Sequence, residues 1–251
     1  MTNTSGPSGS NGKSAPLAGA VALVTGGSRG IGRAIALRLA AMGASVGICG
    51  RDVEALRKTT DELQKSSARV FSQVADVTSA GDVFALVKNA EAALGPVTIL
   101  VNNAGIGLFG PAHEKSEEDW DRVLNTNLKS VFLMSKAVAP SMIQRGAGDI
   151  INISSLAGRN TFAGGGLYCA SKWGVQGLSA CIAEDLRDHG IRVSVVCPGS
   201  VATEFSGQAP KSGTNSLTPE DVAHAVAMIA TQGPRSFLSE VQIRPLRKGK
   251  S

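Results

Sequence analysis

The chain is poor in aromatic residues: seven Phe, two Trp and one Tyr make up 4% of its 251 residues. Abundant Ala, Val, Ile and Gly favour a parallel sheet packed under helices over an aromatic-rich β-sandwich. No apolar run approaches the roughly 20 residues of a membrane-spanning helix. Residues 1–16 also lack the apolar stretch of a signal peptide. We therefore expect a cytoplasmic protein that does not associate with membranes.

Metal-binding and disulfide patterns are lacking as well. The four cysteines, Cys49, Cys169, Cys181 and Cys197, form no CxxC pair and show no metal-ligand spacing with the three histidines. All four lie in runs of apolar or small residues. We therefore expect buried, reduced thiols in a reducing compartment, and no metal site.

Positive charge is in excess, at a formal +5, but it is concentrated at the ends of the chain. Residues 244–251 contain four basic residues and no acid, and residues 1–17 contain one Lys and no acid. A basic face on a folded domain indicates nucleic-acid binding, whereas a basic tail usually does not, so we expect no nucleic-acid partner. The composition predicts a disordered tail over 1–16, a single domain over 17–246 and a basic tail over 247–251.

Apolar runs and amphipathic segments alternate along the domain. The expected strands span residues 20–24, 45–49, 70–74, 97–101, 149–153, 191–196 and 237–243. The expected helices span residues 30–42, 53–65, 79–94, 117–145, 166–188 and 219–231. Strands buried on both faces read as nearly continuous apolar runs, so the alternation predicts a doubly wound, mostly parallel α/β sheet of Rossmann type with seven strands. Trp120 and Phe132 are expected on the apolar side of the helix over 117–145.

A glycine-rich turn follows the first expected strand and opens the first helix. Its glycines fall as G-x-x-x-G-x-G, which differs from the common G-x-G-x-x-G fingerprint of dinucleotide-binding proteins. The strand–turn–helix context nevertheless brings backbone N–H groups to a helix N-terminus, where a pyrophosphate is favoured. The residues predicted to bind a dinucleotide here are Gly26, Ser28, Arg29, Gly30, Ile31 and Gly32.

The end of the second strand indicates which dinucleotide binds. An acid at this position holds a free ribose 2′-hydroxyl, whereas an Arg accepts a 2′-phosphate. Here the strand ends in Gly50 and Arg51, with Arg29 in the turn nearby, so we predict a preference for NADP(H). Asp52 is the competing partner for the ribose, although its position suits an N-cap of the helix that follows.

Polar residues with catalytic potential follow three later strands. Asn103, Ala104 and Gly105 come after the fourth strand, and Ser155 comes after the fifth. Tyr168, the only tyrosine, stands four residues before Lys172, so both lie on one face of a helix. Glycine turn, Asn-Ala-Gly, Ser and Tyr-x-x-x-Lys occur in this order over about residues 17–243. In this combination the chain resembles the short-chain dehydrogenase/reductase family.

The resemblance implies roles for four catalytic residues. Tyr168 would be the general acid in carbonyl reduction, and Ser155 would donate a hydrogen bond to the carbonyl oxygen. The Lys172 ammonium and the cofactor charge would lower the phenol pKa from its usual value of about 10. Lys172 would also bind the nicotinamide ribose. Asn127 would hold a proton-relay water, with Asn125 as the alternative.

The resemblance also assigns the remaining cofactor contacts. Asp76 and Val77 would lie beside the adenine, Asn103, Ala104 and Gly105 along the adenosine ribose, and Pro198, Gly199, Val201 and Thr203 near the nicotinamide. It implies a ketone reductase, for example of the 3-oxoacyl type, acting on a small carbonyl or alcohol substrate. An NADPH-binding regulatory protein without turnover is the alternative. The small-residue face of the helix over 166–188 implies a homodimer or homotetramer.

Some residues remain open between two interpretations. Phe109, Phe162 and Phe205 would either line an apolar substrate pocket or belong to the core. For Cys169 and Trp173, which flank Lys172, packing in the core is the favoured interpretation.

Overall fold

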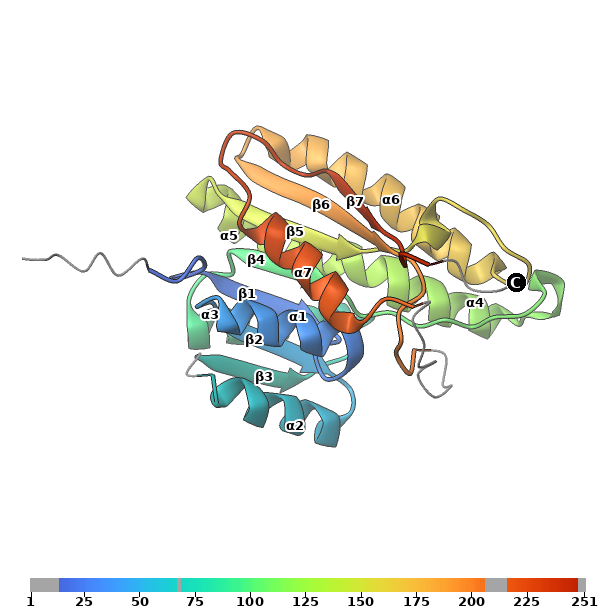
Figure 1. Cartoon of the computed structure of the whole chain (residues 1–251), viewed down its shortest axis with the longest axis horizontal. Helices are drawn as coiled ribbons and strands as arrows, with labels where there is room; N and C mark the ends of the chain where they lie inside the picture. The colour runs from blue at the N-terminus through green and yellow to red at the C-terminus, as the bar shows by residue number, and fades with distance from the viewer. Residues whose placement is uncertain (1–13, 67–68, 206–215, 248–251) are drawn as a thin grey trace, which may run out of the picture.

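Seven parallel strands form one sheet in the computed structural model, which describes residues 14–66, 69–205 and 216–247 (Figure 1). The strands are β1 (Val21–Thr25), β2 (Ser45–Gly50), β3 (Val70–Val74), β4 (Ile99–Asn102), β5 (Gly148–Ile153), β6 (Ile191–Pro198) and β7 (Glu240–Ile243). Their order across the sheet is β3-β2-β1-β4-β5-β6-β7, and every pairing is parallel. The predicted doubly wound seven-stranded sheet is therefore confirmed.

Helices cover both faces of this sheet. They are α1 (Gly30–Ala41), α2 (Val53–Gln64), α3 (Ala80–Leu94), α4 (Glu117–Leu124), α5 (Ser130–Arg145), α6 (Gly166–Arg187) and α7 (Pro219–Ala230). Apolar side chains of α1, α2 and α7 join one buried cluster, and those of α3, α5 and α6 join the other. Strand β1 feeds both, because successive side chains point to opposite faces: Ala22 and Val24 enter the first cluster, Val21 and Leu23 the second.

The order of the strands creates a crevice at one edge of the sheet. The chain builds outward from β1 to β2 and β3, then returns to place β4 on the other side of β1. Connections therefore leave the carboxyl ends of β1 and β4 in opposite directions, and a ligand crevice forms at such a switch point. The fold therefore places the loops after β1, β2, β4, β5 and β6 at the edge of the sheet where a ligand is expected.

The helix expected over 117–145 is interrupted. Residues Asn125–Lys129 form a π-helical turn between α4 and α5. A π turn inserts one residue per turn, so side chains before and after it no longer follow one helical stripe. Accordingly Trp120 and Phe132 are exposed rather than directed into the core, which corrects their predicted placement.

Two further expectations for buried side chains are wrong. Trp173 and Cys181 are exposed on α6, whereas Cys49, Cys169 and Cys197 are buried as expected. Trp173 and Cys181 are eight residues apart, about two helical turns, and so share the face of α6 that points away from the sheet. Cys169, in the first turn of α6, is instead buried, and its Sγ donates to the Asn160 carbonyl at 3.7 Å.

The ends of the domain differ little from expectation. The last strand covers only Glu240–Ile243 of the predicted 237–243, because only these residues pair with β6. Leu17 is buried against the α1 side of the sheet. Most of the two predicted tails, residues 1–13 and 248–251, lies outside the described residues. Within the described part of the chain no helix is long and apolar enough to span a membrane, and no cluster of His, Cys, Asp and Glu suits a metal ion.

Candidate functional site

One cavity of about 1190 Å³ opens at the carboxyl ends of the strands, at the predicted switch point. It is lined by the turn between β1 and α1, the loops that follow β2 to β6, and the first turns of α6. Every residue predicted to bind the cofactor lines it: Gly26, Ser28, Arg29, Gly30, Ile31, Gly32, Arg51, Asp76, Val77, Asn103, Ala104, Gly105, Tyr168, Lys172, Pro198, Gly199, Val201 and Thr203. Ser155 lines the same cavity.

The glycine turn forms a cradle at the start of α1. Gly26 has φ of 62°, in the left-handed region that favours glycine. A Cβ at Gly32 would collide with the Gly26 carbonyl, so the turn also requires glycine there. No side chain caps α1 at its N-cap, Arg29, which leaves the first-turn amides available to an anion. The cradle therefore fits a pyrophosphate.

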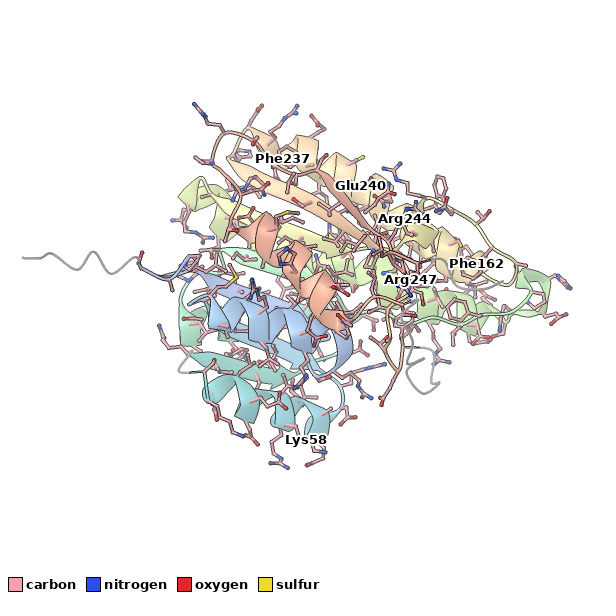
Figure 2. The ribbon with its side chains drawn as sticks, viewed as in Figure 1. Lys58, Phe162, Phe237, Glu240, Arg244 and Arg247 are labelled. Carbon is pink, nitrogen blue, oxygen red and sulfur yellow. The ribbon has the colours of Figure 1, made fainter. Side chains whose placement is uncertain are left out.

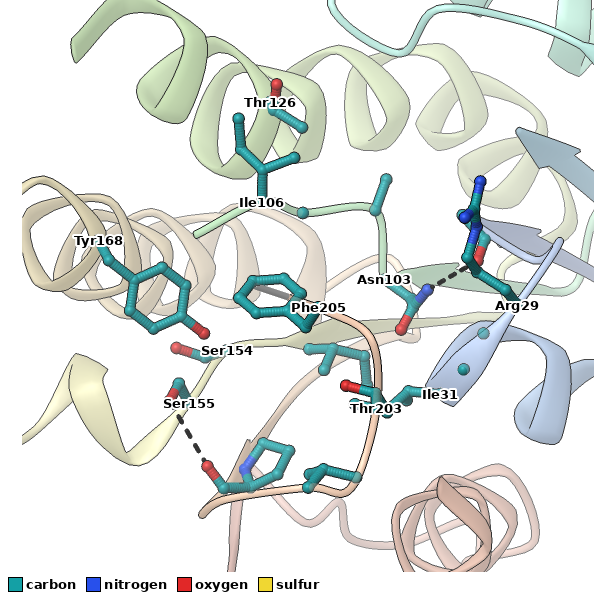
Figure 3. Close-up of a pocket in the computed structure, with 18 of the residues that line it drawn as sticks. Arg29, Ile31, Asn103, Ile106, Thr126, Ser154, Ser155, Tyr168, Thr203 and Phe205 are labelled. Carbon is teal, nitrogen blue, oxygen red and sulfur yellow. Dashed lines mark hydrogen bonds between the residues drawn. The ribbon is translucent and has the colours of Figure 1, made fainter. Parts of the chain in front are cut away.

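Asn103 has a structural task beside this cradle. Its side-chain Nδ2 donates to the Gly26 carbonyl at 3.2 Å (Figure 3) and to the Thr25 carbonyl at 2.9 Å, and its backbone N–H donates to the Thr25 hydroxyl at 3.0 Å. These bonds fasten the loop after β4 to the glycine turn. The side chain expected along the adenosine ribose thus positions the turn.

Arg29, at this end of the cavity, forms an ion pair with an exposed carboxylate. Arg29 Nη2 lies 2.8 Å from Asp52 Oδ2, and both side chains are about half exposed. Asp52 also caps α2, as expected, by accepting a hydrogen bond from Ala55 N at 3.0 Å. That backbone hydrogen bond, aided by the Arg29 charge, lowers the pKa of Asp52. Arg51 is exposed, and its charge adds to the lowering of the Asp76 pKa, which comes mainly from the Thr78 N–H.

Tyr168 and Ser155 meet at the other end of the cavity. Tyr168 lies in the first turn of α6, and Ser155 follows β5, where its Oγ accepts from Ala157 N at 3.1 Å and donates to the Pro198 carbonyl at 3.5 Å (Figure 3). Burial raises the pKa of Tyr168 to about 12, although a hydrogen bond with Ser155 opposes the rise. The expected lowering of this pKa is therefore wrong for the protein alone.

The position of Lys172 explains this difference. Its Nζ is buried, donates to the Ile153 carbonyl at 2.9 Å and lies 5.8 Å from the centre of the Tyr168 ring. The ammonium thus faces the ring of Tyr168, and Lys172 is not among the groups that act on the phenol pKa. Burial lowers the pKa of Lys172 itself to about 8.

Asn127 lies behind the cavity wall, in the π turn. Its Nδ2 donates to the Ile106 carbonyl at 2.9 Å and to Ser171 Oγ at 3.0 Å, and its Oδ1 accepts from Ile106 N at 2.8 Å. Both amide hydrogens are thereby used within the protein. The side chain connects the loop after β4 to α6, beside Tyr168 and Lys172.

Sequence reasoning missed several lining residues. They lie in the loops after β4, β5 and β6 and near the π turn: Ile106, Thr126, Leu156, Asn160, Thr161 and Glu204. None belongs to a motif. The available signal was their position after a strand end, where parallel sheets bind ligands. Phe109, Phe162 and Phe205 also line the cavity and are exposed, which supports the pocket interpretation over the core one.

Comparisons with known proteins agree with this geometry. A sequence profile described as short chain dehydrogenase matches residues 20–213. The NADP-dependent 3-hydroxy acid dehydrogenase YdfG of Salmonella typhi is 37% identical over 238 residues, which cover 90% of this chain and 95% of that protein. Glycine betaine reductase ATRR of Emericella nidulans is 36% identical over 240 residues, 92% of this chain, but the match spans only 19% of that protein.

Solved structures are similar over nearly the whole chain. A metagenomic short-chain oxidoreductase in complex with NADP matches with a TM-score of 0.83 and 44% identity, covering 93% of this chain and 100% of that one. The actinorhodin polyketide ketoreductase with NADPH matches with a TM-score of 0.85 and 33% identity, covering 90% of this chain and 96% of the other.

Proposed function

The chain belongs to the short-chain dehydrogenase family, and on that premise we propose that it is an NADP(H)-dependent ketone reductase of the 3-oxoacyl type. One observation carries the proposal. Ser155, Tyr168 and Lys172 line the same cavity as the glycine cradle and its two arginines. A cofactor seated in the cradle therefore extends toward the tyrosine.

The cavity residues fit NADP(H) along its length. The open N-terminus of α1 would hold the pyrophosphate, and Arg29 and Arg51 would hold the 2′-phosphate. Asp76 and Val77 would border the adenine, and the residues from Pro198 to Thr203 the nicotinamide. The bound nicotinamide supplies or accepts the hydride, and the protein orients it toward the carbonyl carbon.

Tyr168 would hold and release the proton. A pKa of about 12 keeps the phenol protonated at neutral pH, so Tyr168 carries a proton that it can donate to the carbonyl oxygen during reduction. Once the cofactor is bound, its charge and that of Lys172 would lower this pKa and make the phenol a stronger acid. Ser155 would donate a hydrogen bond to the same oxygen as charge develops on it. Lys172 uses one of its three N–H donors on Ile153, which leaves the others for the ribose hydroxyls and for proton relay with a water near Asn127.

The similar proteins support the choice of substrate type. One relative is named for 3-hydroxy acids, which are the reduced forms of 3-oxo acids, and one structural neighbour is named as a ketoreductase. We further propose a homodimer or homotetramer assembled through α6, and residence in the cytoplasm. We propose no nucleic-acid partner.

The test is NADPH oxidation with ethyl 3-oxobutanoate, compared between wild type and Tyr168→Phe. Wild type should turn over, and the variant should lose at least about 1000-fold in kcat while NADPH still raises its melting temperature. Full activity of Tyr168→Phe would overturn the assignment of the acid. Stabilisation by NADPH without turnover of any carbonyl compound would favour the regulatory alternative.

A further inference from the structure

Three phenylalanines surround Tyr168 at the mouth of the cavity. Phe109 comes from the loop after β4, Phe162 from the loop before α6 (Figure 2), and Phe205 from the loop after β6. Phe109 and Phe205 each meet the Tyr168 ring edge-on, with centroids 5.6 and 5.7 Å away, and Phe109 lies 6.0 Å from Phe162. Figure 3 shows the Phe205 ring beside Tyr168 in the cavity. We name these three residues the aromatic cage.

The cage rings lie against open space instead of filling the core. Phe109, Phe162 and Phe205 remain 42%, 50% and 41% exposed, although each lines the cavity. Gly107 leaves room for two of these rings, because a Cβ at this position would lie 2.7 Å from the Phe109 ring and 2.8 Å from the Phe205 ring. Three partly exposed rings, two of them in contact with the Tyr168 ring, form a surface on which another flat apolar group can stack.

Charge is distributed unevenly between the two ends of the cavity. Among the described lining residues, Arg29, Arg33 and Arg51 all lie at the glycine-turn end. Near the cage the charged lining residues are Lys172, which is buried against the Ile153 carbonyl, and Glu204, which precedes Phe205. Among the described lining residues, an anionic group at the cage would therefore lose water and meet the Glu204 carboxylate, while the nearby lining cation, Lys172, is already hydrogen-bonded to the Ile153 carbonyl.

We propose that the cage selects neutral ketones that carry an aromatic ring, and that Glu204 excludes substrates with a carboxylate on that ring. This proposal rests on the ketone-reductase function proposed above. The ring would stack among Phe109, Phe162 and Phe205 while the carbonyl oxygen reaches Tyr168 and Ser155. Because a 3-oxoacyl ester is itself neutral, the aromatic group would be its distal substituent.

Three substrates with the same 3-oxo ester group test the effect of an added aromatic ring separately from the effect of an added negative charge. They are ethyl 3-oxobutanoate, ethyl 3-oxo-5-phenylpentanoate and the latter with a para-carboxylate on its ring, which two methylene groups insulate from the ketone. We expect kcat/KM to rise at least about tenfold from the first to the second, and to fall at least about tenfold from the second to the third. Equal values for all three substrates would overturn the proposal and leave the ketone-reductase function intact. No turnover of any of them would instead contradict that function.

Variants connect these ratios to the named side chains. Phe109→Leu and Phe162→Leu should each lower the ratio of kcat/KM for the phenyl substrate to kcat/KM for ethyl 3-oxobutanoate by about two- to tenfold. Phe84→Leu, an exposed phenylalanine on α3 outside the cavity, is the matched control. Glu204→Lys should raise the ratio of kcat/KM for the carboxylate substrate to kcat/KM for the phenyl ester at least about tenfold.

Each variant is first checked for a melting temperature that NADPH still raises, so that loss of fold is not mistaken for loss of preference. A phenyl preference that survives replacement of both phenylalanines would overturn the role of the cage. A carboxylate substrate that stays excluded in Glu204→Lys would overturn the role of Glu204.

Discussion

Burial shifts the pKa values of two neighbouring residues of α6 in opposite directions. The pKa of Tyr168 rises to about 12 and that of Lys172 falls to about 8, because each side chain loses the water that would stabilise its charged form. Both shifts favour the neutral group. A bound cofactor and substrate would add charges to this region. The two pKa values therefore describe the protein before either molecule binds.

The stability of the fold should depend on pH through Lys172. Its pKa is lowered from 10.5 to about 8, so between these values the unfolded chain binds more protons than the folded one, and stability rises with pH. The raised pKa of Tyr168 has the opposite sign, but it acts only above pH 10. Lys172→Met removes the lysine contribution. Relative to wild type, this variant should therefore be most stable near neutral pH and lose that advantage as the pH approaches 10.

Urea unfolding at about pH 7, 8.5 and 9.5 measures this difference. Lys88→Met, which replaces an exposed lysine of α3, is the control for loss of a lysine side chain. A difference between wild type and Lys172→Met that stays constant across the range would show that Lys172 keeps an ordinary pKa in the folded protein.

In the wild-type protein, Asp52 should weaken NADPH binding, because it forms an ion pair with Arg29. We propose that Arg29 contacts the 2′-phosphate of NADPH. Asp52→Asn removes the negative charge and keeps a good N-cap for α2. We expect NADPH to bind about two- to fivefold more tightly and NADH to bind unchanged, since the ion pair is exposed and weak. Calorimetric titration with both cofactors gives the two affinities.

Adding a negative charge at the proposed 2′-phosphate site supplies the control for removing one at Asp52. Arg51→Asp should weaken NADPH relative to NADH, because a carboxylate repels the 2′-phosphate and accepts a free 2′-hydroxyl. If both variants change the affinities for NADPH and NADH equally, the 2′-phosphate does not bind between Arg29 and Arg51.

The π turn is fastened to α6, the helix that carries Tyr168 and Lys172. Asn127, within the turn, holds both backbone groups of Ile106 and the hydroxyl of Ser171. Asn127→Ala would remove the partner of both Ile106 backbone groups and leave the Ser171 hydroxyl with only its bond to the Tyr168 carbonyl. We expect a cost of about 1–3 kcal/mol in the free energy of unfolding. The substitution should also lower kcat, since α6 carries Tyr168 and Lys172.

Asn125→Ala, in the same turn but only partly buried, is the matched control for Asn127. Urea unfolding and steady-state kinetics of both variants test the prediction. The opposite order, with Asn125→Ala the more damaging, would transfer the positioning role to Asn125.

The same turn shows where sequence reasoning stops. Strands β1 to β6 were predictable because each is a short apolar run between turn residues. The glycine cradle and the Tyr168–Lys172 pair were predictable because each follows a recognisable spacing of residues in the sequence. The π turn leaves no periodic signal within five residues. Phe109, Phe162 and Phe205 are far apart in sequence, and only the strand order brings their loops around Tyr168. Contacts set by topology were therefore the part that the sequence alone could not supply.

Three neighbouring helices each expose a large apolar side chain. Trp120 on α4, Phe132 on α5 and Trp173 on α6 are each nearly half exposed, and these helices contact one another. Soluble monomers rarely expose a large contiguous apolar surface. This arrangement supports the proposed homo-oligomer, in which a second copy would cover these side chains.

Replacing Trp173 with Glu should therefore shift the assembly toward monomers. A carboxylate in a closely packed helix interface loses its hydration without a partner, which disfavours association by several kcal/mol. The fold should persist, because Trp173 lies outside the described core clusters. Sedimentation velocity over a range of concentrations measures the mass, and Phe84→Glu on α3 is the control for adding a charge at an exposed apolar site. Wild type that sediments as a monomer throughout, or a Trp173→Glu protein with unchanged mass, would mean that α6 does not mediate assembly.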